Sequence, residues 1–572
     1  MKRNPLLSET QPVSPRSRTG GHLLALTGAA ILLAATPGAL AATNLYWDAN
    51  GTTGLGGSGT WNNLGNAYWN PSSSGSGTLQ QWDNDLADAD TAIFSGTAGT
   101  VTVADGIVAQ GLRFYAGGYR LTGGSIIIPY PVSSGTTLIQ NHVESGAVEI
   151  ASDIRLNLTG TTGGNTPYHV RNYTSETFTL SGDFVISSAS GTGAKWLSLN
   201  QFGANGTMVL SGSLSYETNS RVGLYFGYET TTTDTATYVL SASNNITESS
   251  TISRGTVLVQ NDGAFGTAII RLGGSDTLST QTVKLLADGA HTIAQTVYLD
   301  RGANTNRVLG GNTADVSTFS GTLSFENASK SVQFTAASGG RVDITGLIND
   351  GTGSSSVEKI GAGVVRLTRA AGNTYDGGTT VTAGTLILAN TSNSATGTGQ
   401  VGVAANATLG GDGIATGLTV AQGAGGTSIF APGAVGAIGT LRLHGGLNAA
   451  NGATFNYQLN GSSIDRIDFG TAALSLDNQV TFNFTSLGTV LTETTYSLFL
   501  GGSTWTAGSN LDFNFVGPTG YDLNTAYGSG NGYIWDAASK SLTVQFSAIP
   551  EPSVSLLAGL GLGVLLWRRR RV

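Results

Sequence analysis

The sequence contains no cysteine, and its 572 residues include only six Lys, five His and 12 Pro. Without cysteine the protein has neither disulfide bonds nor thiolate metal sites, so backbone ladders and packing must stabilise it. The His residues show no paired spacing typical of metal ligands, which argues against a zinc or haem enzyme. They are His22, His142, His169, His291 and His444. With so little Pro and no Gly-X-Y period, a collagen-like triple helix is excluded.

Charged residues are also scarce, at 11% of the chain against a typical ~25%. Apolar residues nevertheless make up 40%, which is too many for a charged disordered tail. Without its two terminal segments, which hold eight basic and two acidic residues, the chain has a net charge near −14. Such a surface offers no basic stripe for phosphates, so nucleic-acid binding is excluded.

Glycine is abundant instead, with 84 residues, about twice the usual frequency of ~7%. The glycines separate short runs of β-forming residues, and weak repetition extends along the chain. This pattern predicts one elongated all-β array that adds coils, in place of several separate globular cores.

The amino terminus has the three parts of a secretory signal. Basic residues occur between positions 2 and 18, an apolar run covers residues 23–35, and Ala39-Leu40-Ala41 gives the small-x-small cleavage pattern. We therefore predict a signal peptide over residues 1–41. The alternative is a permanent membrane anchor, but an apolar run of 13 residues is shorter than the roughly 20 needed to span a bilayer.

The carboxyl terminus, residues 549–572, combines a short motif, an apolar segment and a basic end. Pro550, Glu551 and Pro552 precede the apolar segment 554–567. Four arginines, Arg568, Arg569, Arg570 and Arg571, follow it and are expected to stop the segment on the cytoplasmic side. We predict a short transmembrane helix over 554–567, whose length of about 21 Å falls short of a ~30 Å hydrocarbon core.

These carboxyl-terminal residues resemble the PEP-CTERM sorting signal of Gram-negative bacteria. The resemblance is confined to this terminal segment and keeps all three parts in order. It implies export, an intermediate held in the inner membrane through the carboxyl-terminal helix, and recognition by an exosortase-type membrane transpeptidase. Delivery to the outer envelope, the cell surface or the extracellular matrix would follow. The resemblance implies nothing about what the rest of the chain does.

The clearest internal repeat covers residues 359–390, and a second, more degenerate copy covers residues 238–261. Each reads as short β-strands separated by turns, and a Gly-Thr pair starts the last strand. Strands of three to five residues are stable only when neighbouring coils complete their hydrogen-bond ladders.

The repeat at 359–390 resembles the autotransporter-associated β-strand repeat of bacterial surface proteins. The matching positions are Gly361, Gly363, Leu367, Asn373, Thr374, Tyr375, Gly377, Gly378, Thr379, Gly384, Thr385 and Leu386. The resemblance implies a passenger-type module and does not make the chain an autotransporter.

We predict an all-β, right-handed parallel β-helix, or β-solenoid, with coils of about 20 residues and on the order of 20 to 25 coils. Repeats would fill residues 101–445, between an N-terminal cap at 42–100 and a C-terminal β cap or subdomain at 446–548. Early tryptophans would plug the first coil, namely Trp47, Trp61, Trp69 and Trp82. An antiparallel sandwich array is the alternative, but two-residue hairpin signals are rare here.

Candidate chemistry is sparse. Asp83, Asp85, Asp88 and Asp90 could offer oxygens to calcium, but their spacing lacks the glycine and closing glutamate of an EF-hand, so a solvated loop is the preferred interpretation and no cofactor is predicted. Asp465 and Asp468 are three residues apart, which would place them on different faces of a strand.

Exposed aromatic residues could stack on sugar rings or form ladders along a solenoid face, and the ladder is favoured. The residues in question are Tyr115, Tyr119, Tyr216, Tyr225 and Tyr228. The sequence thus predicts an exported, non-enzymatic structural or adhesin-like protein, with exopolysaccharide as a candidate partner. The alternative is a polysaccharide lyase or hydrolase on a β-helix, which three carboxylates, or a carboxylate and an Arg, converging in one groove would favour.

Overall fold

The computed structural model describes residues 43–549 apart from short internal gaps. The gaps are residues 52–53, 87–88, 130–136, 144–145, 158–166, 188–193, 218–220, 230–233, 275–280, 300–305, 326–328, 424–425, 435, 450–451, 477–478 and 509–511. The expected signal peptide, Pro550, Glu551, Pro552, the segment 554–567 and the four terminal arginines lie outside the described residues. Within them, no helix is both long and apolar enough to cross a membrane.

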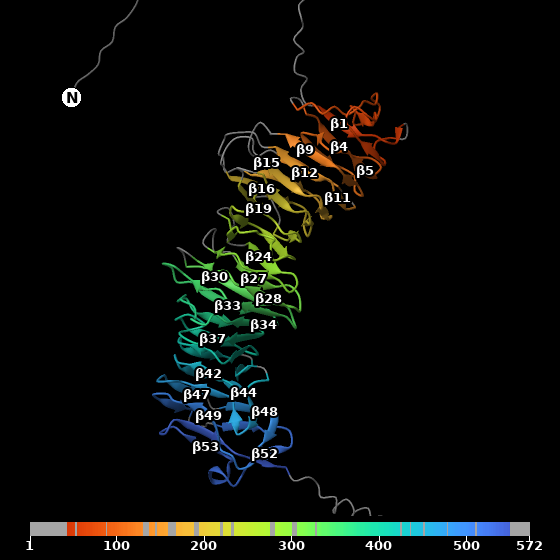
Figure 1. The fold of residues 1–572 in the computed structure, drawn as a ribbon. Coiled ribbons are helices and arrows are strands. Elements are labelled where there is room, and N and C mark those ends of the chain that lie inside the picture. The colour runs from red at the N-terminus through yellow and green to blue at the C-terminus, as the bar shows by residue number, and fades with distance from the viewer. Residues whose placement is uncertain are drawn as a thin grey trace, which may run out of the picture. The chain divides into compact units, whose positions relative to one another are not determined.

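Most of the described chain is a stack of coils whose strands pair in parallel with the strands of the coils before and after (Figure 1). Antiparallel pairs occur near both ends of the stack, for example between Trp47 and Trp69 and between Tyr496 and Val544. A typical coil contributes three strands, one to each of three faces, as β7, β8 and β9 do. This arrangement confirms the predicted β-solenoid. The parallel ladders also exclude the antiparallel sandwich for these strands.

Face 1 consists of two sheets that follow each other along the stack. The first comprises β3 (Trp69–Asn70), β1 (Asn44–Trp47), β4 (Thr91–Phe94), β7 (Gly111–Phe114), β10 (Thr137–Asn141), β13 (Tyr168–Asn172), β16 (Ala194–Gln201), β19 (Arg221–Phe226), β21 (Ser250–Ile252), β23 (Ile270–Leu272), β26 (Val297–Tyr298), β29 (Leu323–Ser324) and β32 (Ile348–Asn349). The second comprises β39 (Ile414–Ala415), β42 (Thr440–Leu443), β46 (Arg466–Asp468), β49 (Tyr496–Leu500), β54 (Ser541–Val544) and β53 (Tyr533–Asp536).

Face 2 is one continuous parallel ladder. It comprises β2 (Gly59–Trp61), β5 (Thr100–Val103), β8 (Arg120–Gly123), β11 (Val148–Ile150), β14 (Phe178–Leu180), β17 (Thr207–Leu210), β20 (Thr237–Leu240), β22 (Gly255–Val259), β24 (Thr282–Ala287), β27 (Asn306–Gly311), β30 (Ser331–Ala336), β33 (Ser356–Ile360), β35 (Thr379–Val381), β37 (Val401–Ala404), β40 (Thr419–Gln422), β43 (Leu447–Ala449), β47 (Leu474–Leu476) and β50 (Trp505–Ala507). Its pairing passes residue 445, where a terminal subdomain was expected, from β40 to β43 and on to β47.

Face 3 again consists of two sheets. The first comprises β6 (Ile107–Val108), β9 (Ser125–Pro129), β12 (Asp153–Asn157), β15 (Phe184–Ser187) and β18 (Leu214–Tyr216). The second comprises β25 (Thr292–Ile293), β28 (Val316–Phe319), β31 (Arg341–Ile344), β34 (Val364–Leu367), β36 (Thr385–Leu388), β38 (Thr408–Gly411), β41 (Ser428–Pro432), β44 (Ala453–Gly461), β48 (Gln479–Val490) and β51 (Asp512–Val516), with β45 (Ser463–Ile464) paired to β44. The remaining elements are β52 (Tyr521–Leu523), β55 (Phe546–Ala548) and a 3-10 turn at Gly528–Gly530.

The coils are less uniform than the sequence suggests. On face 2, Phe178 pairs with Met208, whereas Val401 pairs with Thr419, so the chain makes a much longer coil in the first case than in the second. The expected coil length of about 20 residues therefore fits some coils and not others, because the turns between the strands vary in length.

The interior is filled by side chains that alternate inward along each strand. On face 2 one inward column contains Phe178, Met208, Tyr238 and Val257, each in register with the next. All four are at most 1% exposed. Each coil contributes one side chain to this column, so each coil buries apolar surface against the coils on either side.

The N-terminal end of the stack holds the predicted tryptophan plug. Trp47, Trp61, Trp69 and Trp82 are all at most 1% exposed. Their rings meet at centroid distances of 4.4 Å for Trp69 and Trp82, 4.8 Å for Trp61 and Trp82, and 5.2 Å for Trp47 and Trp69. The plug closes the first coils with a large apolar volume that the short strands alone could not supply.

Candidate functional site

The repeat at residues 359–390 is built around an asparagine that takes the place of a strand. Face 1 is interrupted between β32 and β39, and Asn373 lies in this interruption, 6% exposed. Its Oδ1 accepts a hydrogen bond from the Ile348 N–H of the preceding coil at 2.9 Å, and its Nδ2 donates to the Ala395 carbonyl of the following coil at 2.7 Å. The side-chain amide therefore continues the ladder across three coils.

Two further motif residues shape the same coil. The Tyr375 ring is fully buried, and its hydroxyl lies 2.6 Å from the Thr379 hydroxyl. Gly384 turns the corner between β35 and β36 with a φ of 65°, and a Cβ there would lie 2.4 Å from the Gly361 carbonyl oxygen. The matched positions thus have three roles. Asn373 continues the hydrogen-bond ladder, Tyr375 fills the core, and Gly384 forms a corner that only glycine fits.

The second copy, residues 238–261, repeats this chemistry on other faces. Asn244 lies where face 3 is interrupted between β18 and β25; it accepts from the Leu214 N–H at 2.7 Å and donates to the Ala264 carbonyl at 2.8 Å. Gly255 makes the corresponding corner between β21 and β22 with a φ of 83°. The repeat is therefore a device that replaces a strand and turns a corner, and it is not fixed to one side of the solenoid.

A buried amide ladder runs along the end of face 1. Asn141 Nδ2 donates to Asn172 Oδ1 at 2.8 Å, and Asn172 Nδ2 donates to Gln201 Oε1 at 2.7 Å. All three side chains are fully buried. Stacked amides satisfy one another from coil to coil, which is how these polar groups can lie inside the solenoid.

An aromatic stack lies at the corner directly after this ladder. Tyr115 stacks on His142 at 5.1 Å, His142 on Tyr173 at 4.3 Å, and Tyr173 on Phe202 at 4.6 Å, with the rings within 10° of parallel. Burial, followed by the Arg113 charge, lowers the pKa of His142. Tyr115 is the end ring of this stack and is 51% exposed, and its stacking on His142 makes it part of a ladder, which was the favoured interpretation.

The other singled-out tyrosines are divided between core and surface. Tyr119 is 1% exposed, and its hydroxyl donates to the Ser95 carbonyl at 2.8 Å. Tyr216 is half-buried against the core. Tyr225 and Tyr228 contact each other edge to face at 5.0 Å, and Tyr225 also approaches Trp196 at 6.3 Å. Tyr119 therefore could not offer its ring to a sugar.

Tyr228 belongs to a charged cluster on the outer side of face 1. Arg171 holds Glu229 through two hydrogen bonds, Nε to Oε2 at 2.7 Å and Nη2 to Oε1 at 2.6 Å. His169 lies beneath this ion pair, with its Nδ1 3.1 Å from Asn200 Nδ2, and burial lowers its pKa. The cluster was missed in the sequence because its members come from three different coils and have no spacing signal.

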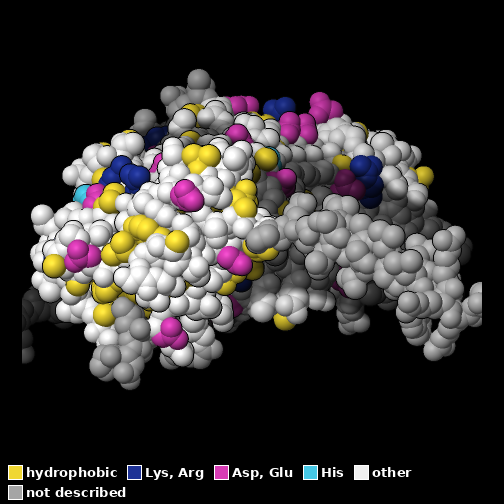
Figure 2. Space-filling model, turned by 90° about the horizontal axis from the view of Figure 1, so that it is seen from below, with side chains coloured by type: hydrophobic (Ala, Val, Ile, Leu, Met, Phe, Trp, Pro, Cys, Tyr) yellow, Lys and Arg dark blue, Asp and Glu magenta, His cyan; other side chains and the backbone are white. Residues whose placement is uncertain are grey.

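The acidic residues proposed for calcium do not converge in the described part of the chain. Asp90 Oδ1 instead accepts hydrogen bonds from the N–H and the hydroxyl of Thr43, both at 2.8 Å, and Asp88 falls in a gap. No group of three or more His, Asp or Glu side chains suited to a metal ion occurs among the residues described. On the face shown in Figure 2, acidic and basic side chains are scattered, without a basic stripe.

The ladder amides, glycine corners and buried columns define a β-solenoid repeat protein. Comparison with protein families adds that residues 357–388 match the passenger-associated-transport-repeat and residues 548–571 match the PEP-CTERM protein-sorting motif. The chain is therefore a solenoid protein that carries a passenger-associated-transport-repeat and a PEP-CTERM sorting motif.

One curated relative is an adhesin, the BmaC autotransporter of Brucella suis biovar 1 (strain 1330). The two chains are 32% identical over 299 residues. The match covers 47% of this chain and 8% of the length of that relative. The similarity is thus to one stretch of a much longer protein.

Proposed function

We propose that this protein is exported and acts, without catalysing a reaction, as an adhesin-like structural protein of the cell surface or extracellular matrix. The observation that carries the proposal is the combination of a passenger repeat, placed inside a continuous parallel solenoid, with a sorting motif at the carboxyl terminus. The adhesin among its relatives supports the same direction.

The solenoid suits a mechanical role. Neighbouring coils share backbone ladders and side-chain ladders, so the stack resists local opening and can present many weak contacts at fixed spacing. Repetition of weak contacts gives avidity without a single deep binding site. We expect the coil to have the right-handed sense that parallel crossovers almost always adopt.

The sorting route rests on the carboxyl terminus. Pro550, Glu551 and Pro552 would be recognised by an exosortase-type transpeptidase while the segment 554–567 and the terminal arginines hold the chain in the inner membrane. The N-terminal segment 1–41 would direct export and be removed.

The sorting proposal is tested in the native host by replacing Pro550, Glu551 and Pro552 with Ala. Intact mass and cell fractionation should show an unprocessed chain retained in the inner membrane. Glu493→Ala, which removes an exposed acidic residue of the body, is the control and should be processed normally. Unchanged processing and localisation of the triple variant would remove the sorting proposal.

The polysaccharide-processing enzyme remains the second candidate because a carboxylate and an arginine do converge at Arg171 and Glu229. Hydrolysis normally uses two carboxylates about 5 to 9.5 Å apart, and this cluster supplies one, already bound at both oxygens. Release of reducing or unsaturated sugars by the wild type, abolished by Glu229→Gln, would favour the enzyme over the adhesin.

A further inference from the structure

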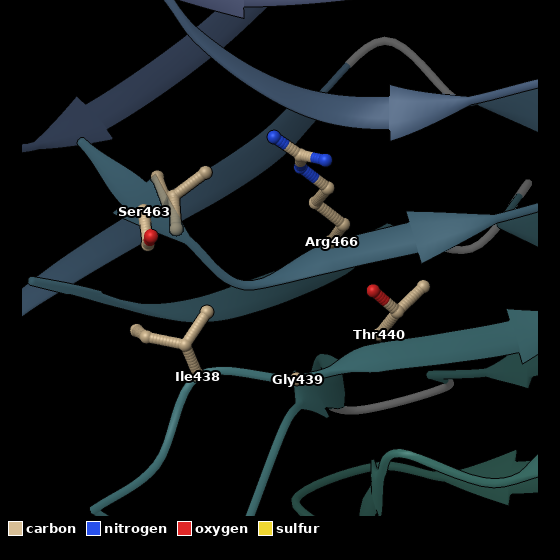
Figure 3. A pocket seen from close by; sticks show the side chains of 6 residues that line it. Ile438, Gly439, Thr440, Ser463 and Arg466 are labelled. Carbon is tan, nitrogen blue, oxygen red and sulfur yellow. The ribbon is translucent and has the colours of Figure 1, made fainter.

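A small pocket opens on the outer side of face 1, where the coils of β42 and β46 meet (Figure 3). It has a volume of about 220 Å³ and is lined by Ile438, Gly439, Thr440, Ser463, Ile464 and Arg466. Thr440 and Arg466 are register partners on adjacent strands, and the residues that follow them, Leu441 and Ile467, are buried in the core. The two polar side chains therefore point outward.

Arg466 is the charged residue in the lining of this pocket. Its side chain is exposed, and its guanidinium makes no hydrogen bond or ion pair with any residue that the structure describes. Some other outer-surface arginines do have counter-ions, as Arg120 has Glu149 at 2.8 Å and Arg221 has Glu248 at 2.7 Å. An arginine fork that is left open in a pocket is suited to a carboxylate, which it can hold through two parallel N–H bonds.

The wall of the pocket is held in place from behind. The Asp465 carboxylate is fully buried and accepts hydrogen bonds from the Gly439 N–H and the Gln458 N–H, both at 2.8 Å. Gln458 Oε1 in turn accepts from the Gly436 N–H at 2.7 Å. These bonds fix the loop that carries Ile438 and Gly439, so the pocket is formed before a ligand arrives.

The pocket also limits what it can hold. Its volume is below the ~300 to 1,000 Å³ of sites for drug-sized molecules, which suits one sugar ring or one small anion. The Asp465 charge behind the wall opposes any anion, and it opposes a doubly charged ligand such as phosphate more strongly than a carboxylate. Two hydroxyls, on Thr440 and Ser463, flank the guanidinium and can exchange hydrogen bonds with a polyhydroxylated ligand.

We propose that this pocket binds a hexuronate unit of an acidic glycan, with Arg466 holding the carboxylate and the hydroxyls of Thr440 and Ser463 meeting ring hydroxyls. The inference deepens the proposed adhesive function, on which it rests, by naming a ligand class. A peptide carboxylate would also use the arginine, and its amide could meet one hydroxyl, but a sugar ring offers several hydroxyl groups to the Thr440 and Ser463 hydroxyls together, so the glycan is favoured.

The test is titration of the purified protein with sodium D-glucuronate, followed by ligand-observed NMR. Glucose, which lacks the carboxylate, and N-acetylglycine, which lacks the ring hydroxyls, are the comparison ligands. We expect glucuronate to bind at least tenfold more tightly than either. Binding of N-acetylglycine as tight as that of glucuronate would overturn the glycan assignment, and no glucuronate binding would overturn the site.

Arg466→Gln should weaken glucuronate binding at least tenfold. Arg442→Gln is the matched control, because Arg442 lies on the same face and its Nη1 donates to the Asp412 carbonyl at 2.8 Å, outside the pocket lining. Equal losses in the two variants would show a general charge effect and overturn the site. Circular dichroism checks that both variants fold. If glucuronate does not bind, the glycan site is overturned but the proposed sorting and surface localisation are not, because those are measured separately in the host.

Discussion

Lys359 places a charged side chain inside the core. It stands in the inward column of face 2, between its register partners Phe334 and Val381, and is fully buried. Its Nζ donates to the carbonyls of Ile360, Gly361 and Ala383 at 2.8 to 2.9 Å. Burial nevertheless lowers the pKa of Lys359 to about 8.

This lowered pKa predicts that stability rises with pH above about 8. Between the folded pKa and the ordinary value of 10.5, the unfolded chain binds a proton that the folded chain does not. The free energy of unfolding should therefore increase by about 1.4 kcal/mol per pH unit. Urea denaturation between pH 8 and 9, where few tyrosines of the unfolded chain are ionised, measures it.

Lys359→Met is the control for the pH prediction, because methionine fills a similar volume and does not titrate. Its unfolding free energy should stay flat over the same pH interval. An equal slope in the wild type and the variant would assign the pH dependence to other groups.

Asn373 should be the most sensitive polar residue of the repeat. Asn373→Ala removes the acceptor of the Ile348 N–H and the donor to the Ala395 carbonyl, and leaves both backbone groups buried. We expect a loss of roughly 2 to 4 kcal/mol and faster hydrogen exchange at Ile348. Asn312→Ala, at an exposed turn where the amide donates to Asp288, should change stability by less than ~0.5 kcal/mol.

At the scale of the element, the glycine corners decide where one face ends and the next begins. In Gly384→Ala the alanine must adopt a φ of 65°, and its Cβ would lie 2.4 Å from the Gly361 carbonyl oxygen. In Gly106→Ala the alanine must adopt a similar φ of 71°, but no atom lies within 4 Å of its Cβ. We expect about 1 kcal/mol of destabilisation at Gly106 and more than ~2 kcal/mol at Gly384, measured by urea denaturation. Equal losses would show that backbone conformation alone sets the cost.

The short strands could be predicted from the sequence because they follow local rules. The Gly-Thr start followed by β-forming residues predicted β36 (Thr385–Leu388) and β22 (Gly255–Val259), and both occur. The face that each strand occupies could not be predicted, because it depends on the lengths of all preceding turns. For that reason the repeat containing Asn244 lies on a different side from the one containing Asn373.

The candidate sites could not be predicted from the sequence either, because their residues come together only when coils stack. Thr440, Ser463 and Arg466 become neighbours only when the coils of β42 and β46 stack, and Arg171 reaches Glu229 across two coils. Asp465 was noted for its spacing from Asp468, yet its role is to hold a loop from inside. Side chains that approach through stacking leave no periodic signal in the chain.

For the whole molecule, stability should be local to each part of the stack. Coils contact mainly their neighbours, so a lesion at one end should not reach distant coils. Trp69→Ala removes the ring that packs on Trp47, Trp61 and Trp82 at 4.4 to 5.2 Å. We expect the first coils to lose about 3 to 5 kcal/mol of local stability.

Hydrogen exchange read by mass spectrometry distinguishes local from global unfolding of the stack. In Trp69→Ala, peptides from β1 through β8 should exchange much faster, while peptides from β37 to β43 should match the wild type. Trp196→Ala, a half-buried ring on the outer side of face 1, should leave the N-terminal peptides protected. If exchange rose equally along the whole chain in Trp69→Ala, the solenoid would be a single cooperative unit, and the tryptophan plug would stabilise every coil at once.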